Sequence, residues 1–97
     1  MKSRLRRLHL DGRVFTWKGE VRHAGTRRFI RVRAWGAGKN SRPLQADLHE
    51  RPNQTYPYPT ADDVRTLVTH ALAAGWTPEA HGAAFVLTNV SLPAFTV

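Results

Sequence analysis

The stretch RRFIRVRAW, residues 27–35, contains residue types that could bind an anionic polymer. Arginine and aromatic residues alternate there with aliphatic ones, and successive side chains of a β-strand point to opposite faces. The expected strand therefore places Phe29, Arg31, Arg33 and Trp35 on one face. Guanidinium groups suit bidentate contact with phosphate or carboxylate, and aromatic rings stack on nucleic-acid bases. This chemistry predicts a surface that binds nucleic acid or an acidic protein.

The histidines and glycines show no spacing typical of a catalytic or metal site. The five histidines form no close H-x-H or H-x-x-x-H pair, and cysteine is absent, so a metal site is not expected. The dipeptide His49-Glu50 could serve acid–base chemistry, but no nucleophile accompanies it. Gly36, Gly38 and Lys39 lie in a loop that could contact an anion, outside any phosphate-binding motif. We therefore predict a protein that is not an enzyme and uses no metal and no cofactor.

The composition is that of one small globular domain spanning residues 1–97. Hydrophobic residues make up 41% and charged residues 23% of the chain, as in ordinary water-soluble proteins. No apolar run reaches the roughly 18 residues that a membrane helix needs, and no long apolar segment follows the basic N-terminus. We expect no membrane span and no secretory signal. The absence of cysteine fits a cytoplasmic location.

Positive charge is concentrated at the N-terminal end of the chain. The formal net charge is +8, and residues 1–33 hold eleven Lys and Arg against two acidic residues, a net charge of +9. Such an excess indicates an anionic partner rather than a particular fold. A GC-rich genome would also raise the arginine content, and this alternative stays open.

Two turns organise this basic region into an expected three-stranded antiparallel meander. Asp11-Gly12 is a strong hairpin signal between strands at 5–10 and 13–22, and we place a second two-residue turn at Ala24-Gly25. Both turns put the aromatic and aliphatic residues of the middle strand on a single face. The expected cross-strand pairs are Leu8 with Phe15, Trp17 with Val32, Lys18 with Arg31, and Arg22 with Arg27.

The second half of the chain predicts one helix between two further strands. Residues 43–49 alternate as a fourth strand, and residues 83–90 are expected to form the last one. Thr60 is a good N-cap with Asp63 in the capping-box position, and Gly75 is placed to end the helix. The apolar stripe of this helix comprises Ala61, Val64, Leu67, Val68, Ala71 and Leu72. For residues 91–97 an extended arm and a flexible tail are both open.

The expected element order is β-β-β-β-α-β, which is an α+β fold. An antiparallel sheet would carry the single helix on one face, so that Phe15, Trp17, Ile30 and Val32 are buried beneath it. The opposite face, called the outer face below, stays open. From the first three strands it carries Arg7, His9, Thr16, Lys18, Glu20, Arg22, Arg27, Phe29, Arg31, Arg33 and Trp35.

Two stretches resemble a pattern found in small uncharacterised bacterial proteins, many of them actinobacterial. The first is VFTWKG, residues 14–19, an aromatic-x-aromatic strand. The second is PTADDVRTLVTHALAAGWTPEAHGAAFVL, residues 59–87, with a V-x-x-x-[IV]-x-x-A-L helix, then G-W-x-P and a phenylalanine strand. The resemblance implies a shared fold and no particular activity. The N-terminal arginine cluster is not part of this pattern.

Like charges oppose one another on the outer face in this register, which is unfavourable for a surface with no partner. We therefore predict a DNA- or RNA-binding protein whose positively charged residues contact phosphates and whose rings stack on bases. The expected binding residues are Arg7, Lys18, Arg22, Arg27, Phe29, Arg31, Arg33 and Trp35. The alternatives are a plain solvated surface, a homodimer formed through the same face, and an immunity-type module that binds an acidic protein.

Overall fold

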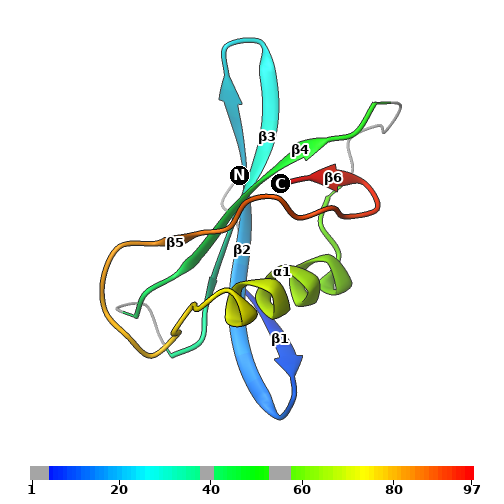
Figure 1. Cartoon of the computed structure of the whole chain (residues 1–97). Coiled ribbons are helices and arrows are strands. Elements are labelled where there is room, and N and C mark those ends of the chain that lie inside the picture. Colours follow the sequence, from blue (N-terminus) through cyan, green and yellow to red (C-terminus); the bar gives the residue numbers. More distant parts are fainter. Residues whose placement is uncertain (1–4, 38–40, 53–57) are drawn as a thin grey trace.

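The computed structural model describes residues 5–37, 41–52 and 58–97 of the chain. Its elements are β1 (Arg6–Leu10), β2 (Arg13–Ala24), β3 (Arg27–Trp35), β4 (Leu44–Glu50), α1 (Ala61–Ala73), β5 (Phe85–Val86) and β6 (Phe95–Thr96). The strands form one sheet in the order β1-β2-β3-β4-β5, with β6 also paired with β4 (Figure 1). The predicted α+β class is confirmed.

The β1–β2 hairpin has the predicted turn and register. Asp11 and Gly12 both adopt positive φ, 50° and 76°, as a type I′ turn requires. Leu8 pairs with Phe15, and both side chains are buried at 1% exposure. The Asp-Gly dipeptide therefore gives this hairpin the turn and the register that the sequence predicted.

The β2–β3 hairpin turns one residue later than the sequence suggested. Ala24 pairs with Arg27, so the loop is Gly25-Thr26, and of these two only Gly25 has positive φ, at 63°. A type II′ turn places glycine at its first central position, whereas a turn at Ala24-Gly25 would force alanine into positive φ.

This later turn moves every β2–β3 pair by two positions. The predicted pairs Trp17–Val32, Lys18–Arg31 and Arg22–Arg27 are wrong. Trp17 pairs with Ala34, Lys18 with Arg33, Glu20 with Arg31, and Arg22 with Phe29. A shift of two residues keeps each side chain on its predicted face, because the side-chain period of a strand is two.

Helix α1 begins and ends at the predicted signals. The Thr60 hydroxyl accepts from the Asp63 N–H at 3.2 Å, and the Asp63 carboxylate accepts from the Thr60 N–H at 3.0 Å, which completes a capping box. At the other end Gly75 has φ 107°, and the Trp76 N–H donates to the Ala71 carbonyl at 2.9 Å. This geometry is a Schellman motif, which turns the chain back toward the core.

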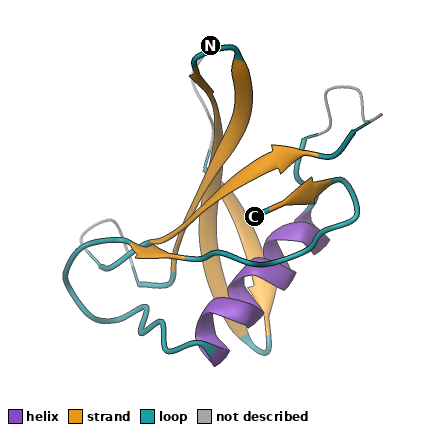
Figure 2. Cartoon of the chain, turned by 45° about the horizontal axis from the view of Figure 1, so that its top comes forward, coloured by secondary structure: helices purple, strands orange, loops and turns teal. Residues whose placement is uncertain are grey.

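The core lies between α1 and the inner face of the sheet (Figure 2). Val64, Leu67, Val68 and Ala71 of the helix are fully buried. Trp76 is 2% exposed, its ring lies 6.0 Å from that of Phe15, and its indole N–H donates to the Arg42 carbonyl at 2.9 Å. Strands β1–β4 contribute Leu8, Phe15, Trp17, Ile30, Val32, Ala34, Leu44, Ala46 and Leu48 to the core, and the C-terminal part of the chain contributes Leu87, Val90, Leu92 and Phe95. The apolar stripe of α1 therefore decides which sheet face is buried.

The last predicted strand is shorter than expected and is parallel rather than antiparallel. Strand β5 covers Phe85–Val86 in place of residues 83–90, and Leu44 of β4 pairs with Phe85. The chain returns through α1 from the end of β4 to its beginning, so the next strand runs in the same direction as β4.

No helix within the described ranges is long and apolar enough to cross a membrane.

The C-terminal segment 91–97, for which the sequence left an arm or a flexible tail open, packs against the sheet. Leu92 is 3% exposed and Phe95 fully buried. The Leu92 N–H donates to the Phe95 carbonyl at 3.0 Å, and β6 pairs with the end of β4. Figure 1 shows this segment on the same side of the sheet as α1, while the β2–β3 hairpin projects beyond the helix.

Phe95→Ala tests whether this segment belongs to the folded core. Removal of a fully buried phenyl ring should lower the free energy of unfolding by about 3–5 kcal/mol. Thr96→Ala, at the exposed neighbouring position of β6, should change it by less than about 0.5 kcal/mol. Urea unfolding of both variants measures the difference, and equal stabilities would show that the segment does not contribute.

Candidate nucleic-acid interface

The outer face of the sheet carries more positive than negative charge. Strand β4 adds Gln45, Asp47 and His49 to the side chains expected from β1–β3, because Leu44, Ala46 and Leu48 point into the core. Its charged residues are Arg7, Lys18, Glu20, Arg22, Arg27, Arg31, Arg33 and Asp47. Six basic side chains against two carboxylates give this face a net charge of +4.

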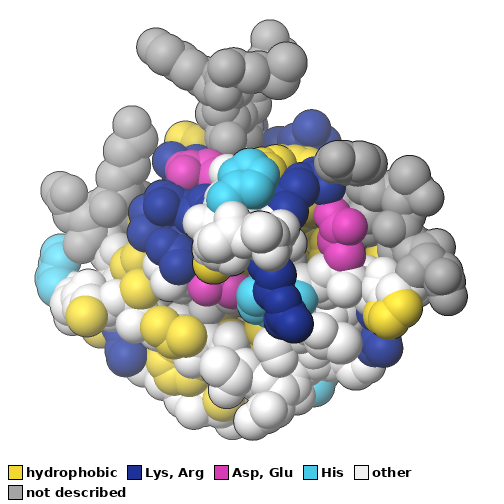
Figure 3. All heavy atoms as spheres, turned by 90° about the horizontal axis from the view of Figure 1, so that it is seen from above, with side chains coloured by type: hydrophobic (Ala, Val, Ile, Leu, Met, Phe, Trp, Pro, Cys, Tyr) yellow, Lys and Arg dark blue, Asp and Glu magenta, His cyan; other side chains and the backbone are white. Residues whose placement is uncertain are grey.

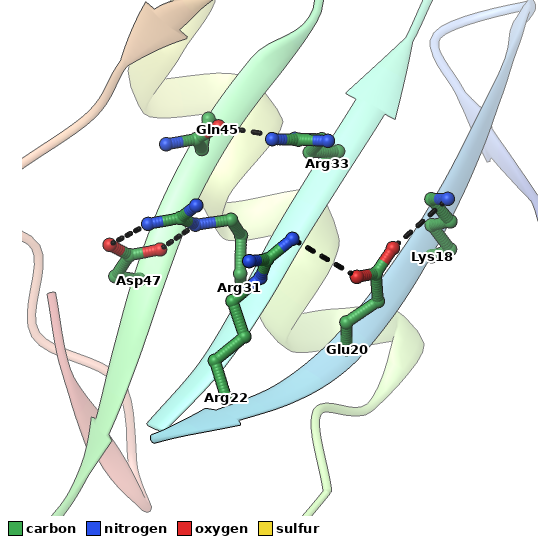
Figure 4. Close-up of polar contacts among 7 residues, drawn as sticks. All are labelled: Lys18, Glu20, Arg22, Arg31, Arg33, Gln45 and Asp47. Atoms are coloured by element: carbon green, nitrogen blue, oxygen red, sulfur yellow. Dashed lines mark hydrogen bonds and ion pairs between the residues drawn. The ribbon is translucent and has the colours of Figure 1, made fainter. Parts of the chain in front are cut away.

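Arg31 is held by a carboxylate in the middle of this face. Its Nε donates to Asp47 Oδ1 at 2.8 Å and its Nη2 to Oδ2 at 3.2 Å, a bidentate pair between neighbouring strands (Figure 4). The hydrogen bond to Asp47 and the negative charge of that residue raise the pKa of Arg31. Two guanidinium nitrogens of Arg31 are therefore already occupied.

Glu20 connects the two basic residues that flank it along β2. Its carboxylate lies 3.0 Å from Lys18 Nζ and 3.3 Å from Arg22 Nη2 (Figure 4). The hydrogen bond from Lys18, together with the positive charges of Lys18, Arg22 and Arg33, lowers the pKa of Glu20 below its ordinary value. Because Glu20 also pairs with Arg31 across the strands, it offsets much of the repulsion in the centre of the face.

Positive charge is less balanced in the neighbouring row of cross-strand partners on this face, where Lys18 and Arg33 lie opposite each other. Arg33 donates from Nε to the Gln45 side-chain oxygen at 3.1 Å, and this neutral amide adds no negative charge. Like charges directly opposed destabilise a sheet by a few tenths of a kcal/mol, roughly. Like charges are therefore opposed at this row, as the sequence predicted, although between a different pair of residues and with Glu20 3.0 Å from Lys18.

The expectation that Phe29 presents an exposed ring is wrong. Its side chain is 8% exposed, the His49 ring lies 5.4 Å away, and the Arg31 guanidinium lies 5.8 Å from its centroid. The long side chains of its neighbours cover this ring although it lies on the outer face. Phe29 therefore supports the arrangement of Arg31 and His49 and offers little surface to a base.

The remaining predicted residues lie toward the two ends of the outer face. Arg7 pairs with Thr16, and Thr16 pairs with Trp35, so these three residues form one row across the sheet. Trp35 is half-buried. Arg27 is exposed beside the turn of the projecting hairpin, and neither it nor Arg7 forms an ion pair within ranges 5–37, 41–52 and 58–97.

The end of the molecule that carries this hairpin is not uniformly basic. Figure 3 shows Lys and Arg side chains there beside acidic and histidine side chains. On the inner side, Arg28 Nη1 lies 2.6 Å from Glu50 Oε1. The predicted residues are thus brought onto one face, but their charges are partly balanced by acids from neighbouring positions.

Sequence reasoning did not use Asp47 and Gln45, although a signal for them was present. The alternation that buries Leu44, Ala46 and Leu48 turns the intervening residues outward. The anion-contacting loop suggested by Gly38 and Lys39 lies outside the described residues. Among the residues that the structure describes, no group of three or more His, Asp or Glu could hold a metal ion.

Comparison of the chain with family models, with curated proteins and with solved structures finds no match. The resemblance to small actinobacterial proteins therefore stays a prediction.

Glu20→Gln tests the role of the carboxylate at the centre of this face. Because the folded-state pKa is lowered, ionised Glu20 stabilises the fold above its ordinary pKa of 4.5, and this contribution is lost as pH falls through the folded-state value. At neutral pH the variant should lose about 0.5 kcal/mol of unfolding free energy, as expected for a partly exposed ion pair. The difference from the parent should shrink as pH drops below 4.5 and then vanish.

Urea unfolding over a series of pH values measures this difference. Glu79→Gln is the matched control, since its carboxylate is 66% exposed and faces only Arg13 among the described residues. It should change the unfolding free energy less than Glu20→Gln at neutral pH. A loss for Glu20→Gln that is the same at every pH would contradict the ionic role.

Proposed function

We propose that this protein binds nucleic acid, without catalysis, through the outer face of β1–β3. The observation that supports this most directly is the net charge of +4 on one face of a sheet whose other face is buried. Basic side chains held at strand spacing can contact successive phosphates and release their counterions. The absence of cysteine fits a cytoplasmic site of action, where such ligands are abundant.

Because of the ion pairs on the outer face, its basic residues differ in their capacity to bind phosphate. Arg31 is occupied by Asp47, and Arg22 is shared with Glu20, so both have less capacity for phosphate. Arg7 and Arg27 have no acidic partner among the described residues, and Arg33 bonds only to a neutral amide there. Phosphate contacts are therefore expected mainly from Arg7, Arg27 and Arg33, whereas Lys18, like Arg22, is shared with Glu20.

The acidic-protein alternative has one observation in its favour. In the bidentate Arg31–Asp47 pair, a carboxylate already lies against one arginine of this face. A partner that presents Asp or Glu side chains could use Arg33 in the same manner. This alternative predicts binding of an acidic protein and no affinity for nucleic acid at low salt. The homodimer stays a prediction, and light scattering over a range of protein concentrations tests it.

Arg33→Ala tests the nucleic-acid proposal against salt. The logarithm of the binding constant for a DNA oligonucleotide should fall linearly with the logarithm of the salt concentration. Loss of one phosphate contact in Arg33→Ala should reduce the slope by about 0.9 with a duplex or about 0.7 with a single strand. Arg65→Ala is the matched control, since Arg65 lies on α1 at the other side of the sheet and carries the same charge. Fluorescence anisotropy of labelled oligonucleotides gives both slopes.

Equal effects of the two alanine variants would show that only net charge matters and that the outer face is not the site. Absence of binding by the parent at low salt would exclude the proposed function altogether.

Glu20→Gln should strengthen nucleic-acid binding although it weakens the fold. Its carboxylate competes with phosphate for Lys18 and Arg22, and removal of this negative charge releases both. We expect the affinity at low salt to rise several-fold, and Glu79→Gln to raise it less. Unchanged or weaker binding by Glu20→Gln in the same anisotropy titration would place the ligand away from Glu20.

A further inference from the structure

Trp35 differs from the other aromatic residues of the sheet in its surroundings. Trp17 and Trp76 are 2% exposed and belong to the core, and Phe29 is covered on the outer face. Trp35 is half-buried on that face and has no ring or cation contact within the described part of the chain. Of the two indole rings carried by the sheet, that of Trp35 is therefore less buried than that of Trp17.

The neighbours of Trp35 on the outer face are small or basic. Thr16 is its direct cross-strand partner, and Arg33 lies two residues before it on the same strand and the same face. Lys18 is diagonal to it, next to Thr16 along β2, and Arg7 lies beyond Thr16 in the same row. Directly opposed and diagonal positions lie roughly 5–8 Å apart in a sheet, which places Lys18 and Arg33 near the ring. Arg7 is two strands away from Trp35, roughly 10 Å.

The two carboxylates of the outer face lie on one side of this basic group, and Glu20 reaches only Lys18 among its members, at 3.0 Å. Glu20 and Asp47 share the row of Arg31, one row beyond Lys18 and Arg33. The outer face is thus less basic in the row of Glu20, Arg31 and Asp47 and more basic in the rows of Arg33 and Trp35. A ligand attracted by positive charge would be held most strongly near Arg33 and Trp35.

The combination of a ring and flanking cations on a sheet fits unpaired nucleotides better than a duplex. A base can stack on an aromatic ring only if one of its faces is free, as in single strands. In a duplex both faces are covered by neighbouring base pairs, so Trp35 would contribute little there.

We infer that Trp35 stacks on one base of single-stranded nucleic acid, while Arg7 and Arg33 contact the adjoining phosphates and Lys18 is shared between phosphate and Glu20. This inference rests on the proposed function and specifies its ligand. The projecting hairpin is a less suitable reader of a duplex groove, because Arg22 and Arg28 near its end are paired with Glu20 and Glu50.

Three probes of equal length test this assignment: an oligothymidylate of about 12 nucleotides, an abasic oligonucleotide with the same number of phosphates, and a duplex. The parent should bind the oligothymidylate most tightly and show quenching of tryptophan emission with this probe alone. Trp35→Leu should weaken binding of the oligothymidylate about tenfold, to the level of the abasic strand. Its affinity for the abasic strand should be unchanged.

Trp35→Phe keeps a ring at this position and should recover most of the lost affinity, which separates stacking from a folding defect. Circular dichroism and urea unfolding of both variants confirm that each is folded. Equal binding of the oligothymidylate and the abasic strand, or tighter binding of the duplex, would overturn the assignment and leave nucleic-acid binding by charge intact. If none of the three probes binds at low salt, the proposed function fails together with the assignment.

Discussion

Burial of one face of the sheet beneath α1 is the constraint on which the other features depend. Ile30, Val32 and Leu48 are fully buried against the apolar stripe of the helix. Because side chains alternate along a strand, each buried residue turns its neighbours outward, and a slip of one residue would place arginines in the core. The arginines of β3 therefore occupy the outer face as a direct consequence of how the core is packed.

The outer face shows how a sheet can keep a cluster of basic residues without losing its fold. Glu20 and Asp47 lie in the row of Arg31, where repulsion between strands would otherwise be greatest. Exposed ion pairs of this kind contribute about 0.2–1 kcal/mol each, far less than the buried side chains of the core. The acids thus moderate the repulsion, while the core holds the strands in place.

The same acids shape what the face can bind. They leave Arg31 and Arg22 partly occupied, and they leave the region near Arg33 and Trp35 with uncompensated positive charge. Phe29 and Trp35 have the same strand parity, yet Phe29 is covered by Arg31 and His49. Strand parity alone does not tell which of two rings on one face is available to a ligand.

The sequence by itself determined the features that depend on near neighbours: the Asp11-Gly12 turn, the capping box of Thr60 and Asp63, and the face to which each strand residue points. The predicted β2–β3 register was misplaced because two placements of the Gly25 turn bury the same side chains, and only the strain of alanine at positive φ, a local signal, separates them. The tertiary structure decided features that no local signal indicates. It decided the parallel direction of β5 and the packing of Phe95, which depend on where α1 returns the chain. The partner of Arg31 is Asp47, sixteen residues away, and these side chains meet only because β3 and β4 pair in one register.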